Sequence, residues 1–202
     1  MSQYFENDNK IKHNVKIFSA NILDTNFNFY TDNGVFNKNG VDYGSRLLLE
    51  NFIKHYTDGS VLDVGCGIGI IGVTLSSVIN ADVDMVDVNL RALELANKNV
   101  KLNNLMSNVN VFESNCYSNV SKSYDYIITN PPIRAGKKIV YEILLNAINH
   151  LNENGELWFV IRKDQGALSA KRDVEEVFKN CEVMDKDKGF FILRAKKFLY
   201  NI

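Results

Sequence analysis

Polar residues stand at the ends of four short apolar runs, and these are the residues that could do chemistry in this sequence. Runs of this length predict buried strands of a parallel sheet, whose carboxyl ends meet at one edge. Because ligands of such sheets bind outside that edge, we expect the polar side chains to line one crevice. The residues are Asp63, Asp87, the pair Ser114 and Asn115, and Asn130.

A glycine-rich turn follows the first of these runs and opens a predicted helix. It contains Gly65, Gly67 and Gly69, and glycine permits both a positive φ and the close approach of a ligand to the backbone. The next helix then points free N–H groups at that ligand. Asp87 ends the following run, where a carboxylate can bind ribose hydroxyls. The pattern predicts a nucleoside cofactor; the alternative is a tight turn without a ligand.

A second motif surrounds the two prolines of the chain, Pro131 and Pro132, which follow Asn130. Proline fixes φ and removes an N–H group, so the strand should end in a rigid turn. The Asn130 side-chain oxygen and the Pro131 carbonyl could then hold the two hydrogens of a planar –NH2 group. Such preorganised acceptors would favour a pyramidal, nucleophilic nitrogen. The alternative is a turn that merely ends a buried strand.

These two motifs, VLDVGCGIG and NPPI, resemble the class I S-adenosylmethionine-dependent methyltransferases that act on exocyclic or amide nitrogens. The segments 34–36, 42–46 and 130–137 resemble more narrowly the small-subunit rRNA guanine-N2 methyltransferases of the RsmC type. The likeness spans roughly residues 15–197 and is strongest to short relatives that lack the duplicated N-terminal half. It implies an enzyme with S-adenosyl-L-methionine as cofactor and RNA as partner.

The resemblance also implies roles for single residues. Asp63 and the three glycines would lie near the methionine part of the cofactor, and Asp87 would bind its ribose. Asn115 stands where the family usually has an aspartate that accepts from the adenine amine. The catalytic turn would be Asn130, Pro131 and Pro132. Ile133 stands where an aromatic residue often stacks on the target base, and isoleucine supplies no π-face.

Positive charges follow the Asn-Pro-Pro-Ile turn at Arg134, Lys137 and Lys138, and the next strand is followed by Arg162 and Lys163. We expect these residues on one rim of the crevice, in contact with the phosphates of a substrate. The alternative is an ordinary solvated charged face.

Strands that alternate with helices predict an α/β fold in which a Rossmann-like, doubly wound sheet carries helices on both faces. We expect seven strands, mostly parallel, with one antiparallel strand from a closing hairpin over 182–194. Residues 1–59 should form a hairpin and a helix that pack on a methyltransferase core of residues 60–202, the whole being one domain. This extension either folds over the cofactor or has only a packing role. The predicted helices cover 44–58, 70–79, 89–100, 140–151 and 169–180.

The composition excludes several functional classes. With a net charge of −1 over 202 residues, any nucleic-acid binding must come from a local patch. The three cysteines and three histidines are scattered, so we expect reduced thiols and no metal site. No signal-like or membrane-spanning run is present, so we expect a cytoplasmic protein without a membrane partner. The scattered cysteines are Cys66, Cys116 and Cys181, and the scattered histidines are His13, His55 and His150.

We therefore expect an N-methyltransferase that acts on an exocyclic amine of guanine in rRNA. One alternative keeps the chemistry and changes the substrate to a protein glutamine or a small-molecule amine. Another is a non-catalytic, cofactor-binding RNA chaperone. A nicotinamide oxidoreductase ranks last, because it leaves the Asn-Pro-Pro turn unexplained.

Overall fold

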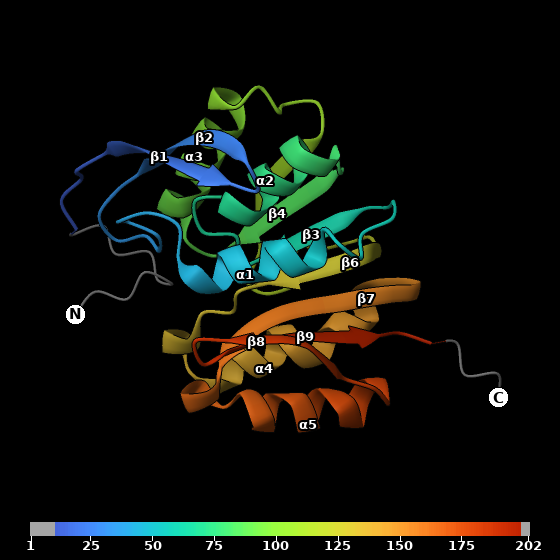
Figure 1. Ribbon diagram of the computed structural model, residues 1–202. Helices are drawn as coiled ribbons and strands as arrows, with labels where there is room; N and C mark the ends of the chain where they lie inside the picture. Colours follow the sequence, from blue (N-terminus) through green and yellow to red (C-terminus); the bar gives the residue numbers. More distant parts are fainter. Residues whose placement is uncertain (1–10, 199–202) are drawn as a thin grey trace.

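A seven-stranded sheet runs through the middle of the computed structural model, which describes residues 11–198 (Figure 1). Its strand order is β5-β4-β3-β6-β7-β9-β8, and β9 runs antiparallel to both of its neighbours. The predicted Rossmann-like, mostly parallel sheet is confirmed. The strands are β3 (Val61–Val64), β4 (Val83–Asp87), β5 (Val109–Glu113), β6 (Tyr124–Thr129), β7 (Leu151–Arg162), β8 (Glu182–Asp187) and β9 (Phe190–Lys196).

Helices cover both faces of this sheet, with α1, α2 and α3 on one side and α4 and α5 on the other (Figure 1). The side chains of each strand alternate between the two cores. In β3, Val61 joins the core under α1 to α3, and Leu62 joins the one under α4 and α5. The helices are α1 (Tyr43–Phe52), α2 (Ile70–Ile79), α3 (Leu90–Leu102), α4 (Lys137–Asn146) and α5 (Ala167–Phe178), with 3₁₀ turns η1 (Ile133–Ala135), η2 (Ala147–His150) and η3 (Lys163–Gln165).

The N-terminal hairpin, β1 (Lys16–Ile22) and β2 (Thr25–Thr31), packs against α3 through buried aromatic residues of β2. Buried Asn99 of α3 secures this contact. Its Oδ1 accepts from the Tyr30 N–H at 2.6 Å, and its Nδ2 donates to the carbonyls of Tyr30 and Ile68. Since Ile68 belongs to the glycine-rich turn, one side chain links the hairpin to that turn.

Three details differ from the pattern-based expectation. Helix α1 ends at Phe52, well before residue 58, because the chain turns back there and the Tyr56 hydroxyl donates to the Gly59 carbonyl. Leu90, expected on the buried face of its helix, is 47% exposed because it starts α3 before the helix reaches the sheet. Leu151, expected to be the last apolar residue of the helix over 140–151, instead begins β7.

The strand order reverses direction between β3 and β6, where successive crossovers leave toward opposite edges. Ligands of open α/β sheets bind at such a switch point. Within residues 11–198, no helix is long and apolar enough to span a bilayer. The same part of the chain brings together no group of three His, Cys, Asp or Glu residues that could hold a metal ion.

Candidate active site

A crevice of about 340 Å³ opens at the carboxyl ends of β3 to β6. Its volume is in the range of small-molecule sites. The structure thus brings together the polar residue that ends β4 and those that follow β5 and β6, which are far apart in the sequence. The walls are formed by Phe36, Val64, Gly65, Gly67, Asp87, Val88, Ala92, Ser114, Asn115, Cys116, Asn130, Pro131, Pro132, Ala135, Ile139 and Ile143.

The glycine-rich turn lies directly against this crevice. The N–H groups of Gly65 and Cys66 donate to the Val86 carbonyl at 2.8 and 3.0 Å, which ties the turn to the end of β4. Gly67 has a φ of +55°, and a Cβ atom there would meet nothing within 4 Å. Glycine at this position therefore serves the backbone conformation and leaves the turn open to a ligand.

Asp87 lies on the wall between the glycine-rich turn and α3. Its Oδ2 accepts from the Gly67 N–H and its Oδ1 from the Asn89 N–H, both at 2.8 Å. Burial raises the pKa of this carboxyl, while the N–H groups of Asn89, Gly67 and Val88 lower it. A carboxylate has about four acceptor positions and these three N–H groups use three of them, so about one remains for a hydroxyl group in the crevice. An acceptor at this position fits a ribose hydroxyl group.

Two residues expected beside the cofactor lie elsewhere. Asp63 is buried beneath the turn and does not line the crevice; its Oδ2 accepts from the Gly72 N–H at 3.1 Å, and its Oδ1 has no partner. Burial raises the Asp63 pKa to about 7, with the Gly72 N–H lowering it and the Asp87 charge raising it. Gly69 also faces inward, where a Cβ would approach Met85 Cε to 3.1 Å. Both residues support the start of α2.

The Asn-Pro-Pro turn forms the opposite wall. The Thr129 hydroxyl donates to the Val64 carbonyl at 2.7 Å, which holds the end of β6 beside β3. The 3₁₀ turn η1 uses the carbonyls of Pro132 and Ile133, so that of Pro131 lies outside its hydrogen bonds. Asn130 and Pro131 therefore present acceptors on the same crevice as Asp87.

Residues before β3 complete the site, although their roles were not expected from their sequence positions. Phe36, from the N-terminal extension, lines the crevice. Asp42 caps α1 by accepting from the Gly44 N–H at 2.9 Å, and its other oxygen accepts from Asn130 Nδ2 at 3.1 Å. Ser45 Oγ lies 3.0 Å from the same Nδ2. An aspartate just before a helical stretch is a sequence signal for a helix cap, but not for this contact with Asn130.

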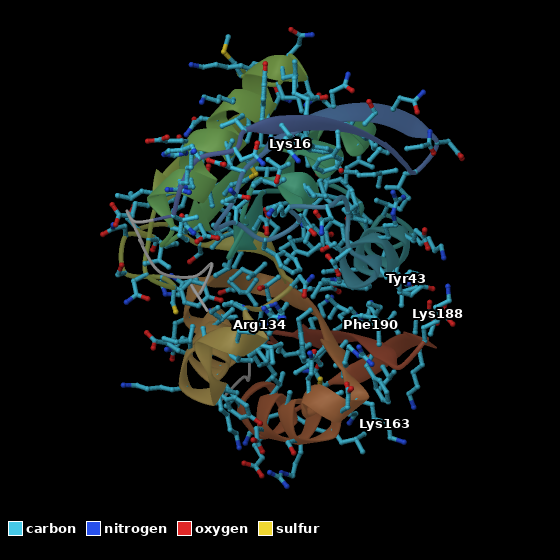
Figure 2. All side chains as sticks on the ribbon, turned by 90° about the vertical axis from the view of Figure 1, so that its left-hand side faces the viewer. Lys16, Tyr43, Arg134, Lys163, Lys188 and Phe190 are labelled. Atoms are coloured by element: carbon cyan, nitrogen blue, oxygen red, sulfur yellow. The ribbon has the colours of Figure 1, made fainter. Side chains whose placement is uncertain are left out.

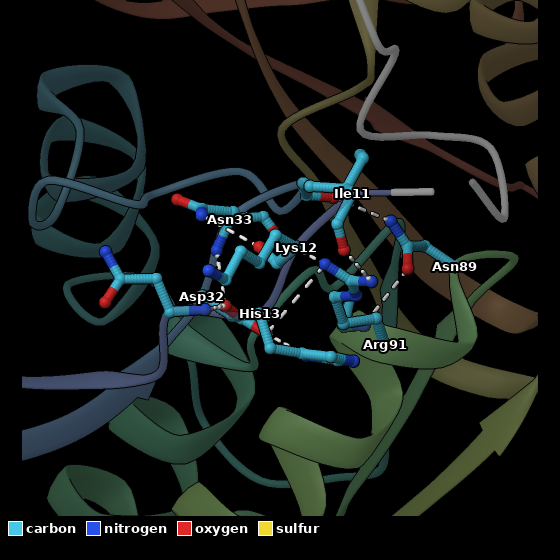
Figure 3. A network of polar contacts seen from close by, with 10 residues as sticks. Ile11, Lys12, His13, Asp32, Asn33, Asn89 and Arg91 are labelled. Atoms are coloured by element: carbon cyan, nitrogen blue, oxygen red, sulfur yellow. Dashed lines mark hydrogen bonds and ion pairs between the residues drawn. The ribbon is translucent and has the colours of Figure 1, made fainter. Parts of the chain in front are cut away.

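A network of polar contacts ties the N-terminal segment to the first turn of α3 (Figure 3). Arg91 donates to the Asn33 carbonyl at 2.9 Å and to the Ile11 carbonyl at 2.8 Å, and it lies 3.9 Å from the Asp32 carboxylate. Asn89 donates to the Gly34 carbonyl at 3.1 Å. The network anchors the segment that carries Phe36, next to Asp87.

Exposed cations and half-buried aromatic rings lie on a neighbouring surface that we call the rim, although none of these residues lines the crevice itself. Tyr43 and Phe190 lie with ring centroids 5.8 Å apart, with Lys188 Nζ 4.2 Å from the Tyr43 ring. Figure 2 shows these three residues together, with Arg134 and Lys163 in the same view. The predicted rim residues Arg134, Lys137, Lys138, Arg162 and Lys163 are all exposed, and Ile133 packs partly against the core under α4.

Comparisons with known proteins agree with this geometry. The family model of the methyltransferase small domain matches residues 26–194. The Bacillus subtilis protein YbxB, described as uncharacterized, is 44% identical over 96% of this chain and 98% of its own length. Ribosomal RNA small subunit methyltransferase C of Erwinia tasmaniensis is 35% identical over 81% of this chain and 48% of its own.

Among solved structures, a T. thermophilus 16S rRNA N2 methyltransferase, RsmC, in complex with AdoMet and guanosine superimposes with a TM-score of 0.82. It is 26% identical to this chain, and the match covers 91% of this chain and 50% of that one. The chain thus spans about half the length of the named rRNA methyltransferases that it matches.

Proposed function

The chain belongs to the methyltransferase small domain family of class I S-adenosylmethionine-dependent enzymes, and from this premise we propose that it methylates the N2 amine of guanine in ribosomal RNA. One observation carries the proposal: the acceptors of Asn130 and Pro131 share a crevice with the Asp87 carboxylate. The proposal places the enzyme in the cytoplasm with its RNA.

S-adenosylmethionine, when bound, supplies a methyl group on a positively charged sulfur. The crevice fits this cofactor, because Asp87 can accept from ribose hydroxyls and the open backbone at Gly67 leaves room for the rest. The Asn115 side-chain oxygen would accept from the adenine amine without a charge. Gly65, which lines the crevice and faces Pro132 Cδ at 3.7 Å from a Cβ built on it, would contact the methionine part.

Asn130 Oδ1 and the Pro131 carbonyl would accept the two hydrogens of the guanine amine. With S-adenosylmethionine bound, the amine nitrogen held by these two acceptors would take up the methyl group, and the electron pair of the broken S–C bond would stay on sulfur. Both hydrogen bonds strengthen as positive charge develops on nitrogen, so they stabilise the transition state more than the bound substrate. The nitrogen then releases one proton to water, and no side chain has to act as a strong base.

The aromatic and cationic rim supports RNA as the substrate. Tyr43 and Phe190 pack together at the start of α1, where Phe190 lies against Gly44 and the cap residue Asp42 contacts Asn130. Arg162 lies over the Phe190 ring at 5.4 Å. Aromatic rings flanked by cations bind single-stranded RNA through stacking and phosphate contacts. This rim can supply the π-face that Ile133 does not.

The substrate class is tested by letting RNA and protein compete for one labelled methyl donor. The enzyme is incubated with unmethylated small ribosomal subunits and radiolabelled S-adenosylmethionine, and aliquots are digested with nuclease or protease. We expect nuclease to release the label, as N2-methylguanosine. Label released only by protease would overturn the RNA proposal and favour a glutamine amide, which presents the same –NH2 group.

A further inference from the structure

We propose that Asp42 is a positioning residue that sets which end of the Asn130 side-chain amide faces the substrate. This inference rests on the proposed function, because it assigns a role to the same amine-binding oxygen. An asparagine side chain has an accepting and a donating end of nearly equal shape, and only its surroundings decide between them. At Asn130 the wrong orientation would present N–H groups to an amine that itself donates.

The surroundings of the amide nitrogen accept hydrogen bonds and do not donate them. Nδ2 of Asn130 donates to Asp42 Oδ2 at 3.1 Å and to Ser45 Oγ at 3.0 Å. An ionised carboxylate can only accept. The Ser45 hydroxyl gives its own hydrogen to Asp42 Oδ2, so its lone pair is what it offers to Asn130. Both N–H groups of the Asn130 amide therefore donate a hydrogen bond. If this amide were turned over, its oxygen would face the carboxylate oxygen of Asp42.

The other end of Asn130 is left for the substrate. Among the described residues Oδ1 accepts no hydrogen bond, and it is not among their buried, unpartnered side-chain atoms. Asp42 itself is held by α1, because the Gly44 N–H donates to Oδ1 at 2.9 Å and the Ser45 N–H at 3.3 Å. The start of a helix 88 residues away in sequence thus orients the catalytic amide.

The isosteric change Asp42→Asn tests this reasoning. Asparagine is as good a helix cap as aspartate, and the N–H groups of Gly44 and Ser45 hold its oxygen on the helix. Its amide nitrogen must then face Asn130, so a donor replaces an acceptor. We expect the Asn130 amide to turn over, with a fall of about 100- to 1000-fold in single-turnover methyl transfer. Cofactor affinity and the free energy of unfolding should change little.

The double variant Asp42→Asn with Asn130→Asp swaps the two groups and should restore most of the rate. One oxygen of the new carboxylate accepts from the new amide, and the other faces the crevice as an acceptor. Asn130→Asp alone sets two carboxylates together, so it should be slow at neutral pH. Asp58→Asn, an exposed change in the loop before β3, is the matched control and should keep the wild-type rate.

A readout independent of turnover is the side-chain NH2 signal of Asn130 in nitrogen-15 NMR spectra. Its hydrogens should exchange slowly with water in the wild type and faster in Asp42→Asn. A wild-type rate in Asp42→Asn, or a double variant no faster than that single one, would overturn the role of Asp42. If Asn130→Ala itself keeps the wild-type rate, the proposed function fails first, so the two failures are distinguishable.

Discussion

At the scale of single residues, Asp87 is the group that we expect to hold the cofactor. Asp87→Ala should weaken S-adenosylmethionine binding by about 1–3 kcal/mol, because the ribose hydroxyls lose a charged acceptor. Isothermal titration calorimetry measures this change directly. Asp82→Ala removes an equal charge from an exposed position before β4 and should leave the affinity unchanged. An unaltered affinity in Asp87→Ala would remove this residue from the site.

Asp63 makes stability depend on pH. Its pKa is about 7 in the fold and 3.8 ordinarily, so the folded chain binds the proton more tightly than the unfolded chain. The stability contributed by the protonated carboxyl is fully present below about pH 4 and is lost as pH rises toward 7. Asp63→Asn keeps an acceptor for Gly72 and has no charge to bury.

We therefore compare the free energies of unfolding of Asp63→Asn and the wild type, measured with urea and without cofactor. The value for Asp63→Asn should increase relative to the wild-type value as pH rises from 5 to 8. The rise of the Asp63 pKa from 3.8 to about 7 corresponds to a few kcal/mol, on the order of 1.4 kcal/mol per pKa unit. A difference between the two proteins that stays constant with pH would show that Asp63 does not titrate in this window.

The positions of the candidate site residues were predictable from the sequence only where the order of strands and helices brings them to one edge of the sheet. Gly67 and Asp87 follow adjacent strands, so their place at one sheet edge followed from the alternation of strands and helices. The contact of Asp42 with Asn130 depends on how α1 packs over the sheet, and no local pattern encodes that. Asp63 illustrates the opposite case, since it stands beside the motif in the sequence but lies beneath the turn, outside the lining of the crevice.

At the scale of elements, boundaries were predictable where backbone geometry changes sharply. Helix α2 matches the expected 70–79 because Gly69 and Asn80, both with positive φ, bound it. Strand β6 matches 124–129 because Pro131 follows its last residue within two positions. The end of α1 was placed too late because apolar residues continue past Phe52 and pack on the core as a turn.

We expect cofactor binding to depend on how firmly the N-terminal segment, residues 11–36, is held against the rest of the fold. Arg91→Ala leaves the Ile11 and Asn33 carbonyls and the Asp32 carboxylate without their cation. Residues 11–36 should then exchange amide hydrogen faster, and cofactor affinity should fall several-fold because Phe36 is less firmly held. Hydrogen-exchange mass spectrometry with and without cofactor measures both effects.

Arg172→Ala is the matched control for that experiment, since Arg172 is an exposed residue of α5 that pairs with its neighbour Asp173. It should leave exchange in residues 11–36 as it is in the wild type. If Arg91→Ala behaves in the same way, the polar network of Figure 3 has no influence on the site.

At the scale of the whole molecule, the net charge of −1 means that the proposed RNA substrate would have to bind to a local patch of positive charge. Replacing Arg134, Lys137 and Lys138 with alanine should weaken RNA binding and flatten its salt dependence. The slope should fall by about 0.9 log–log units per lost contact where the bound RNA is duplex-like. Fluorescence anisotropy over a range of salt concentrations gives this slope, and cofactor affinity should stay unchanged.

A second triple variant distinguishes phosphate contacts at the rim from the general effect of losing three positive charges. It replaces Lys98, Lys101 and Lys179 with alanine. These lysines lie toward the far ends of α3 and α5. Their loss should change the salt slope much less. Equal slopes in the two triple variants would mean that the rim is an ordinary solvated face.

The central claim is that the Asn130 oxygen in this crevice activates a guanine amine. The measurement that tests it most directly is single-turnover methyl transfer from labelled S-adenosylmethionine to unmethylated small-subunit rRNA, at saturating RNA and cofactor, followed by nucleoside analysis. Wild type should place the label in N2-methylguanosine. Asn130→Ala should be about 100- to 1000-fold slower with unchanged cofactor affinity, because the lost hydrogen bond acts on the chemical step. Label in another nucleoside, or a near-normal rate for Asn130→Ala, would contradict the account.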